Sequence, residues 1–132
     1  MHNVYVTAHR ATNTMLENFK ANQSLITDLQ ELGFYGTDCL GSFKEDGQEQ
    51  AAEELSFCIK CETVANATAV QILATEYYEQ DAVLSVDTTT NIAYLLSNDE
   101  AMEIGEFKAV PERQALKSEC YTYINGTFFM VL

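Results

Sequence analysis

The chain has 132 residues, of which 47% are hydrophobic and 20% charged, and its formal net charge at pH 7 is −13. These values are typical of one folded domain, spanning 1–132, and exclude a disordered chain. The negative charge argues against nucleic acid as a ligand, because phosphate binding needs clustered lysine and arginine, and it favours a cationic ligand or a basic partner. The sequence has no apolar run long enough to span a membrane and no visible export signal, so we expect neither membrane insertion nor secretion.

Strands and helices are expected to alternate over most of the chain. Hydrophobic residues at every second position predict strands, and those at helical spacing predict helices. Thr12, Asn13 or Thr14 can cap the first helix, and Gly33 is suited to end it. The expected order is strand 3–9, helix 15–33, strand 36–43, loop 44–52, strand 53–61, helix 64–79, strands 82–86 and 91–96, an irregular stretch 98–118, and strands 120–124 and 127–132. Asn125-Gly126 is a strong signal for a two-residue hairpin turn between the last two strands.

The strand at 53–61 opens with two adjacent carboxylates, Glu53 and Glu54. From Leu55 onward hydrophobic residues occupy every second position, so the two faces of this strand differ and Glu54 shares a face with Ser56. A carboxylate at the end of such a strand is held by a rigid support, which suits a catalytic or binding group. The simpler interpretation is a solvated strand end, because charged side chains are usually exposed.

The four cysteines do not predict a metal centre or a disulfide framework. Cys58 and Cys61 form a C-x-x-C pair, but three steps along a strand place them on opposite faces, whereas a redox pair normally begins a helix. Neither histidine has metal-site spacing to the cysteines. We therefore expect reduced thiols that fill the core, with no metal and no cofactor.

The element order matches the ferredoxin-like β-α-β-β-α-β arrangement, an α+β fold with an antiparallel sheet, two helices on one face and, here, extra C-terminal strands. The predicted helices cover one face of that sheet. No third long helix is predicted for the other face, so we expect a homo-oligomer that buries it.

Several short segments, taken in order, resemble the phage S-adenosylmethionine lyases, formerly called S-adenosylmethionine hydrolases. The resemblance covers the chain to about residue 96, and the order and spacing of the segments carry it more than any one of them. The matching segments are Val4–Ala8 with Arg10, Tyr35-Gly36, Gly41–Glu45, Glu53-Glu54 and Tyr78–Asp81.

This resemblance implies a small ferredoxin-like protein that forms a trimer with active sites between subunits, without a cofactor. It implies degradation of S-adenosylmethionine in the cytoplasm of the infected bacterial host, which starves restriction and methylation systems. The family's reaction is expected to proceed by attack of the substrate's own carboxylate, giving methylthioadenosine and L-homoserine lactone. A hydrolase would give homoserine instead.

The resemblance implies the acidic pair and Phe43 as site residues, and the residues themselves suggest Tyr35, Glu79 and Arg10. Glu54 and Glu53 are the expected catalytic residues, with Glu54 favoured, and Tyr35, Phe43, Glu79 and Arg10 are expected to bind substrate. The family can carry a tyrosine at the position of Phe43, so a mechanism that needs that phenol has no donor there. A structural ion pair is the preferred interpretation of Arg10.

Two other classes of function remain open at this stage. An acidic DNA mimic would block a restriction enzyme through its carboxylates, although a mimic needs its charges in a long regular array. Candidates for part of that surface are Glu45, Asp46, Glu49, Glu53 and Glu54. A ferredoxin-like regulatory domain would bind a metabolite without consuming it. An assay for methylthioadenosine release separates both from a lyase.

Overall fold

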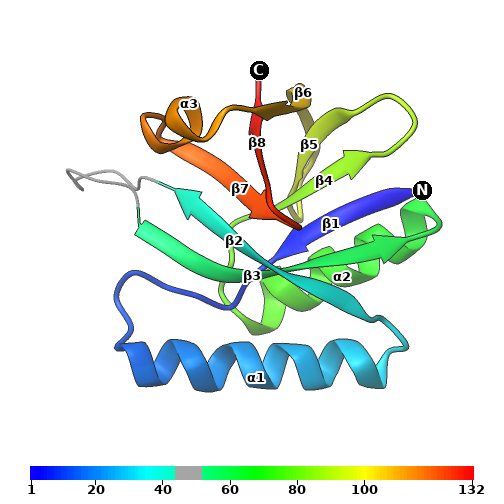
Figure 1. The fold of residues 1–132 in the computed structure, drawn as a ribbon. Helices are drawn as coiled ribbons and strands as arrows, with labels where there is room; N and C mark the ends of the chain where they lie inside the picture. Colours follow the sequence, from blue (N-terminus) through cyan, green and yellow to red (C-terminus); the bar gives the residue numbers. More distant parts are fainter. Residues whose placement is uncertain (44–51) are drawn as a thin grey trace.

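A computed structural model of the chain describes residues 1–43 and 52–132 (Figure 1). The strands are β1 (His2–Val6), β2 (Gly36–Phe43), β3 (Ala52–Cys61), β4 (Val83–Asp87), β5 (Ile92–Leu96), β6 (Ala101–Val110), β7 (Cys120–Ile124) and β8 (Thr127–Val131). The helices are α1 (Met15–Glu31), α2 (Val64–Tyr77) and α3 (Glu112–Leu116). Of the helices within the described ranges, none has the length and apolar character needed to cross a membrane.

The eight described strands form one closed antiparallel barrel in the order β1-β3-β2-β7-β8-β6-β5-β4. The prediction of an open ferredoxin-like sheet is therefore wrong. β2, β3, β1 and β4 are neighbours in that order, with α1 and α2 on the same side of them, but β5 to β8 continue the sheet from β4 back to β2 and close it (Figure 1). The face that we expected an oligomer to cover is the inside of the barrel, so that argument for an oligomer fails.

Closure gives the molecule two hydrophobic cores, one on each side of the sheet. The outer core lies between the barrel wall and the two long helices, and includes Val4, Val6, Leu25, Leu29, Phe57, Ile59, Cys61 and Val70. The inner core fills part of the barrel with Val86, Ala93 and Phe107, and with Tyr5, Leu84, Ile104, Phe129 and Val131 packed against them. The β3 residues in these cores, Phe57, Ile59 and Cys61, all belong to the outer core.

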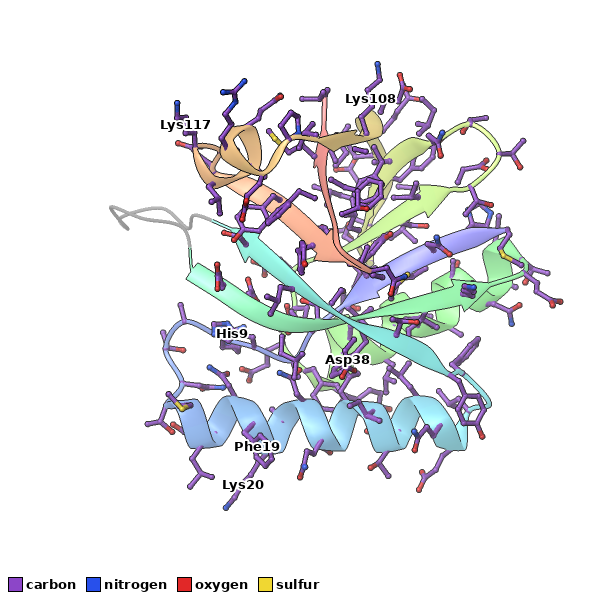
Figure 2. All side chains as sticks on the ribbon, in the orientation of Figure 1. His9, Phe19, Lys20, Asp38, Lys108 and Lys117 are labelled. Carbon is purple, nitrogen blue, oxygen red and sulfur yellow. The ribbon has the colours of Figure 1, made fainter. Side chains whose placement is uncertain are left out.

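α1 begins at a capping box in which Thr14 and Glu17 each bond the other's backbone nitrogen, at 3.1 and 2.9 Å. The helix packs into the outer core mainly through its C-terminal half, with Leu25 and Leu29 buried. The helical spacing of Met15, Leu16, Phe19 and Leu32 with Leu25 and Leu29 predicts that all six are buried, but these four are exposed. Phe19 points away from the sheet (Figure 2). The buried positions nearer the start of α1 are instead Asn18 and Asn22.

The stretch 98–118, predicted to be irregular, contains β6 and α3. Alternation of hydrophobic residues does not predict β6, because its pairing with β5 is interrupted between Ala93 and Tyr94, where a bulge shifts the register. As a result Ile104 and Phe107, three residues apart, both pack against the inner core. A bulge of this kind breaks the period of two on which strand prediction depends.

The hairpin predicted at Asn125-Gly126 is confirmed. Both residues have positive φ, 51° and 80°, and Ile124 pairs with Thr127. β7 and β8 are the strands that join β2 to β6, so this turn contributes directly to barrel closure.

Leu25→Ala tests how α1 is oriented on the barrel. Leu25 is fully buried, so the cavity left by truncation should lower the free energy of unfolding by about 2–5 kcal/mol. Leu16→Ala on the same helix removes the same atoms from an exposed side chain and should change the free energy of unfolding by less than about 0.5 kcal/mol. Chemical denaturation of the two variants gives the comparison, and equal losses would contradict the orientation described here.

Candidate functional site

One end of the barrel brings together the polar groups that the sequence separates. The end of β1, the start of β3, the end of β2 and the start of β7 meet there, because neighbouring strands run antiparallel. Gly41 of β2 lies opposite Glu54 on one side and Thr122 on the other, and Ser42 lies opposite Glu53 and Tyr121. We call this end the barrel mouth.

The two adjacent glutamates point to opposite sides of the wall. Glu54 lines a cavity inside the mouth, whereas Glu53 lies on the outer side and accepts a hydrogen bond from Tyr121. The alternation predicted for this strand is confirmed by Phe57 and Ile59, which lie in the outer core. Within one subunit, the two carboxylates therefore cannot contact the same part of a substrate.

The cavity at the mouth has a volume of about 120 Å³ and a largely apolar lining. Its walls come from five strands and the segment after β1. The lining residues are Tyr5, Thr7, Cys39, Gly41, Ser42, Glu54, Ser56, Leu84, Cys120, Tyr121 and Thr122. A side-chain carbon added at Gly41 would come within 3.2 Å of the Ser56 hydroxyl, so glycine keeps the cavity open opposite Glu54.

His9 lies beside Glu54 at the rim. Its Nδ1 atom is 3.3 Å from Glu54 Oε2, and the two side chains are 21% and 16% exposed. His9 belongs to the segment between β1 and α1, beneath the start of β3 (Figure 2). We did not select His9 as a catalytic residue from the sequence, since a histidine at a strand end is more often structural, and nothing local indicates that it meets Glu54.

Tyr121 is a second residue that sequence patterns did not identify. Its hydroxyl donates to Glu53 Oε1 at 2.8 Å, and the side chain is buried. Burial, followed by this hydrogen bond, raises the pKa of the Tyr121 phenol. The phenol therefore stays protonated and ties the start of β3 to β7 across Ser42.

Inside the mouth, thiols and a phenol lie deeper than Glu54. Burial raises the pKa of Cys39 to about 12 and also raises the pKa values of Tyr5 and Cys58. At the rim, burial and then the negative charge of Glu54 raise the pKa of the Cys120 thiol. These groups are neutral near pH 7, so Glu54 faces a neutral interior. In the part of the chain with described positions, no three His, Cys, Asp or Glu side chains are grouped to hold a metal ion.

Arg10 and Glu79, both predicted to bind substrate, interact with each other. Arg10 Nε lies 3.5 Å from Glu79 Oε2, and the guanidinium also donates to the Glu79 backbone carbonyl. The structural ion pair preferred for Arg10 is thus present. Phe43 ends β2 opposite Cys120, but its side chain lies outside the described residues, as do 44–51 with the loop predicted there.

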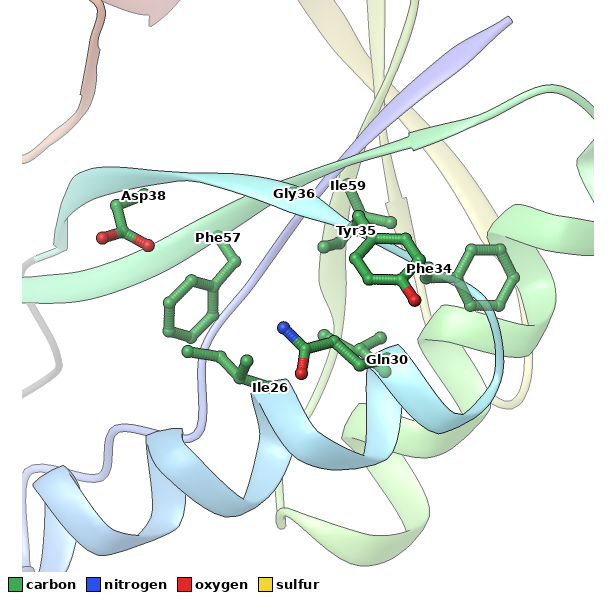
Figure 3. A pocket seen from close by; sticks show the side chains of 9 residues that line it. Ile26, Gln30, Phe34, Tyr35, Gly36, Asp38, Phe57 and Ile59 are labelled. Atoms are coloured by element: carbon green, nitrogen blue, oxygen red, sulfur yellow. The ribbon is translucent and has the colours of Figure 1, made fainter.

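Tyr35 lies away from the mouth. It precedes the first residue of β2, six residues before Gly41, which is about 20 Å along a strand. There it lines a separate cavity of about 140 Å³ between α1 and the outer wall, together with Gln30, Phe34 and Asp38 (Figure 3). Within one subunit, Tyr35 and Glu54 are too far apart to contact the same part of a ligand.

The family comparison agrees with this chain over nearly its whole length. The model of the S-adenosylmethionine lyase family matches residues 4–132, including the C-terminal third that contributes β6 to β8. The chain therefore belongs to the S-adenosylmethionine lyase family, whose name denotes lyase activity with S-adenosylmethionine as substrate. A search of curated proteins found no match.

The reactivity of Cys120 tests the mouth geometry without any assumption about activity. Removing the charge in Glu54→Gln should lower the pKa of the Cys120 thiol, because that charge raises it. Only the thiolate is the nucleophile, so alkylation of Cys120 below its pKa should become several-fold faster, up to about tenfold for a shift of one pH unit. Glu53→Gln, on the outer side, is the matched control and should leave the rate nearly unchanged. Mass spectrometry of native protein treated with iodoacetamide measures both, and equal rates in wild type and Glu54→Gln would contradict the placement.

Proposed function

We propose that this protein cleaves S-adenosylmethionine into methylthioadenosine and L-homoserine lactone, with Glu54 as the principal site residue. Family membership supports the substrate and the class of reaction. The observation that carries the assignment to Glu54 is its position inside the barrel mouth, beside His9 and opposite Gly41. A net charge of −13 favours the approach of a cationic substrate.

The proposed reaction needs no metal and no water. A carboxylate oxygen of the methionine part attacks the γ-carbon, the bond from that carbon to sulfur breaks, and the electron pair goes to sulfur. The sulfonium becomes a neutral thioether, and the two products account for every atom. Catalysis then consists mainly of holding the flexible tail in a reactive conformation, an effect that reaches about 7–11 kcal/mol in the best intramolecular cases.

The charge change defines what Glu54 can usefully do. Positive charge on sulfur disappears in the transition state, so a carboxylate against sulfur would stabilise the bound substrate more than the transition state. We therefore assign Glu54 to the substrate ammonium or the ribose hydroxyls, where it fixes the tail without opposing the reaction. The apolar lining of the cavity helps to exclude water. A carboxylate that activated water as a general base would instead give homoserine, the hydrolase alternative.

Glu53 is assigned a supporting part in this site. Its hydrogen bond from Tyr121 fastens the first residues of β3 to β7, and Glu54 is the next residue along the strand. Phe43, Arg10, Glu79 and Tyr35 are retained as candidate substrate-binding residues. Of these, Arg10 is in the segment that carries His9 and pairs with Glu79, whereas Tyr35 requires a second subunit to reach a mouth.

We further propose that the protein acts as a homo-oligomer, the trimer that the family resemblance implies, with sites between subunits. Two features support assembly. The mouth cavity, about 120 Å³, is smaller than the roughly 300–1,000 Å³ of pockets that enclose comparable ligands. On the outer wall, Leu40 and Leu55 lie opposite each other in β2 and β3 and are 37% and 41% exposed.

In the cell, we place this activity in the cytoplasm of an infected bacterium, where loss of S-adenosylmethionine would deprive restriction and methylation systems of their methyl donor. The alternative of a DNA mimic is less well supported, because Glu53 and Glu54 point to opposite sides of the wall and do not extend one array. Its other acids, Glu45, Asp46 and Glu49, lie outside the described residues.

Incubation with S-adenosylmethionine should release methylthioadenosine, with homoserine lactone as the first partner product. Glu54→Gln should keep the fold and lower kcat by about 100-fold or more, since it removes the charge that binds the tail. Glu62→Gln, an exposed glutamate just beyond the other end of β3, is the control and should retain activity. Rapid quenching and mass spectrometry identify the products.

Homoserine carrying oxygen from labelled water in its hydroxyl group, with no earlier lactone, would replace the lyase mechanism by hydrolysis. No turnover by the wild-type protein would contradict the proposal as a whole and favour a binding protein or a mimic.

Leu40→Lys tests the proposed assembly. A charge in an apolar contact should disrupt association, and turnover should fall with it if the sites lie between subunits. Met102→Lys, at another exposed apolar position on β6, should leave both unchanged. Analytical ultracentrifugation gives the state of association. A wild-type protein that is monomeric and active would contradict the proposal.

A further inference from the structure

We propose that His9 is a positioning residue for Glu54, held in place by two buried asparagines of α1. This inference rests on the proposed function, because it takes Glu54 as the group that binds the substrate. It starts from the contact between the two side chains, His9 Nδ1 to Glu54 Oε2 at 3.3 Å, in a place where both are mostly shielded from water. An interaction between partly buried groups is screened less than one on the surface.

Hydrogen bonds hold the backbone before, at and after His9. The amide nitrogen of Ala8 donates to Asn22 Oδ1 at 2.8 Å, and that of Arg10 donates to Asn18 Oδ1 at 2.9 Å. Asn18 also donates through its Nδ2 to the Arg10 carbonyl at 3.1 Å. The His9 carbonyl accepts from Gln80 at 3.1 Å.

Asn18 and Asn22 occupy helix positions where hydrophobic residues would be expected. Both are buried on the side of α1 that faces the barrel, and a buried amide destabilises a fold unless its hydrogen bonds are made. Here those bonds go to the backbone on either side of His9. A connection that only had to link β1 to α1 would not need two buried side chains to define its path.

The same segment is also tied to β3, the strand that carries Glu54. Thr7 donates through its hydroxyl to the backbone carbonyl of Leu55 at 2.7 Å, and the His9 nitrogen donates to the Thr7 hydroxyl oxygen at 3.1 Å. Through Thr7, the backbone at His9 is therefore hydrogen-bonded to the strand that carries Glu54. An imidazole fixed in this way engages one carboxylate oxygen of Glu54 and restricts the rotation of the whole group.

Kinetics of the full-length protein on S-adenosylmethionine test this role. His9→Ala should lower kcat by about 10- to 100-fold, because loss of orientation at a reacting centre has effects of this size. His9→Asn should recover most of the loss, since the asparagine amide nitrogen can occupy nearly the position of the imidazole Nδ1. The other histidine supplies the control: His2→Asn, at the far end of β1, should behave as wild type.

A double-mutant cycle separates positioning from a general structural effect. If His9 acts through Glu54, His9→Ala should have less than about a twofold effect in the Glu54→Gln background, because the group that it orients is already disabled. A wild-type rate in His9→Ala, or the same fold-loss in both backgrounds, would overturn the inference.

If His9→Ala does not fold, His9→Asn carries the test. A His9→Asn protein that folds but has a kcat as low as that of Glu54→Gln would also overturn the inference. Absence of turnover in the wild-type protein would overturn the proposed function together with this inference, whereas turnover that His9→Ala leaves unchanged would overturn this inference alone.

Discussion

Barrel closure is the constraint on which the rest of this structure depends. Once β7 and β8 join β2 to β6, alternate residues of each strand must share one enclosed interior. Glu54 belongs to the interior set, whereas Glu53, one residue earlier, belongs to the outer set. A single step along β3 thus decides which carboxylate faces a cavity. An open sheet would have exposed both.

Closure also explains why the molecule has two hydrophobic cores, one under the helices and one inside the barrel. The outer core, under α1 and α2, supplies most of the large fully buried side chains, such as Leu25, Leu29 and Ile59. The inner core is apolar toward one end, where Phe107 stacks on Phe129 with ring centres 4.9 Å apart. At the mouth, Ser56, Thr122 and Glu54 add polar groups to a cavity whose lining is otherwise largely apolar. The helices thus stabilise the wall from outside and leave the inside available for a site.

The sequence predicts the elements that depend on local signals. Alternation over 53–61, a polar cap before α1 and the Asn125-Gly126 turn each involve residues close together in the chain. The structure confirms them and selects Thr14 among the three candidate caps. Barrel closure depends on β2 pairing with β7, whose partners Gly41 and Thr122 are far apart in sequence. The bulge in β6 hides the strand that completes the circle. The sequence indicates neither the β2–β7 pairing nor the strand β6, and without them the remaining elements match an open ferredoxin-like sheet.

The candidate site follows the same rule. Glu54 is identifiable because its strand is strongly patterned and because the surrounding segments resemble a family. His9 and Tyr121 are not, since each meets its glutamate through a contact between distant strands or loops. Even the asparagines of α1 have a local signal only in retrospect: they are polar residues at positions that the helical period assigns to the core.

The interaction on which the proposed function depends is the binding of substrate by Glu54 in the barrel mouth. A crystal structure with S-adenosylhomocysteine, an analogue whose neutral thioether sulfur cannot undergo the proposed cleavage, tests it most directly. We predict that the analogue's ammonium or a ribose hydroxyl lies within about 2.6–3.2 Å of a Glu54 carboxylate oxygen, with part of the ligand in the mouth cavity. An analogue bound only in the cavity between α1 and the outer wall, without contact to Glu54 from any subunit, would contradict this prediction.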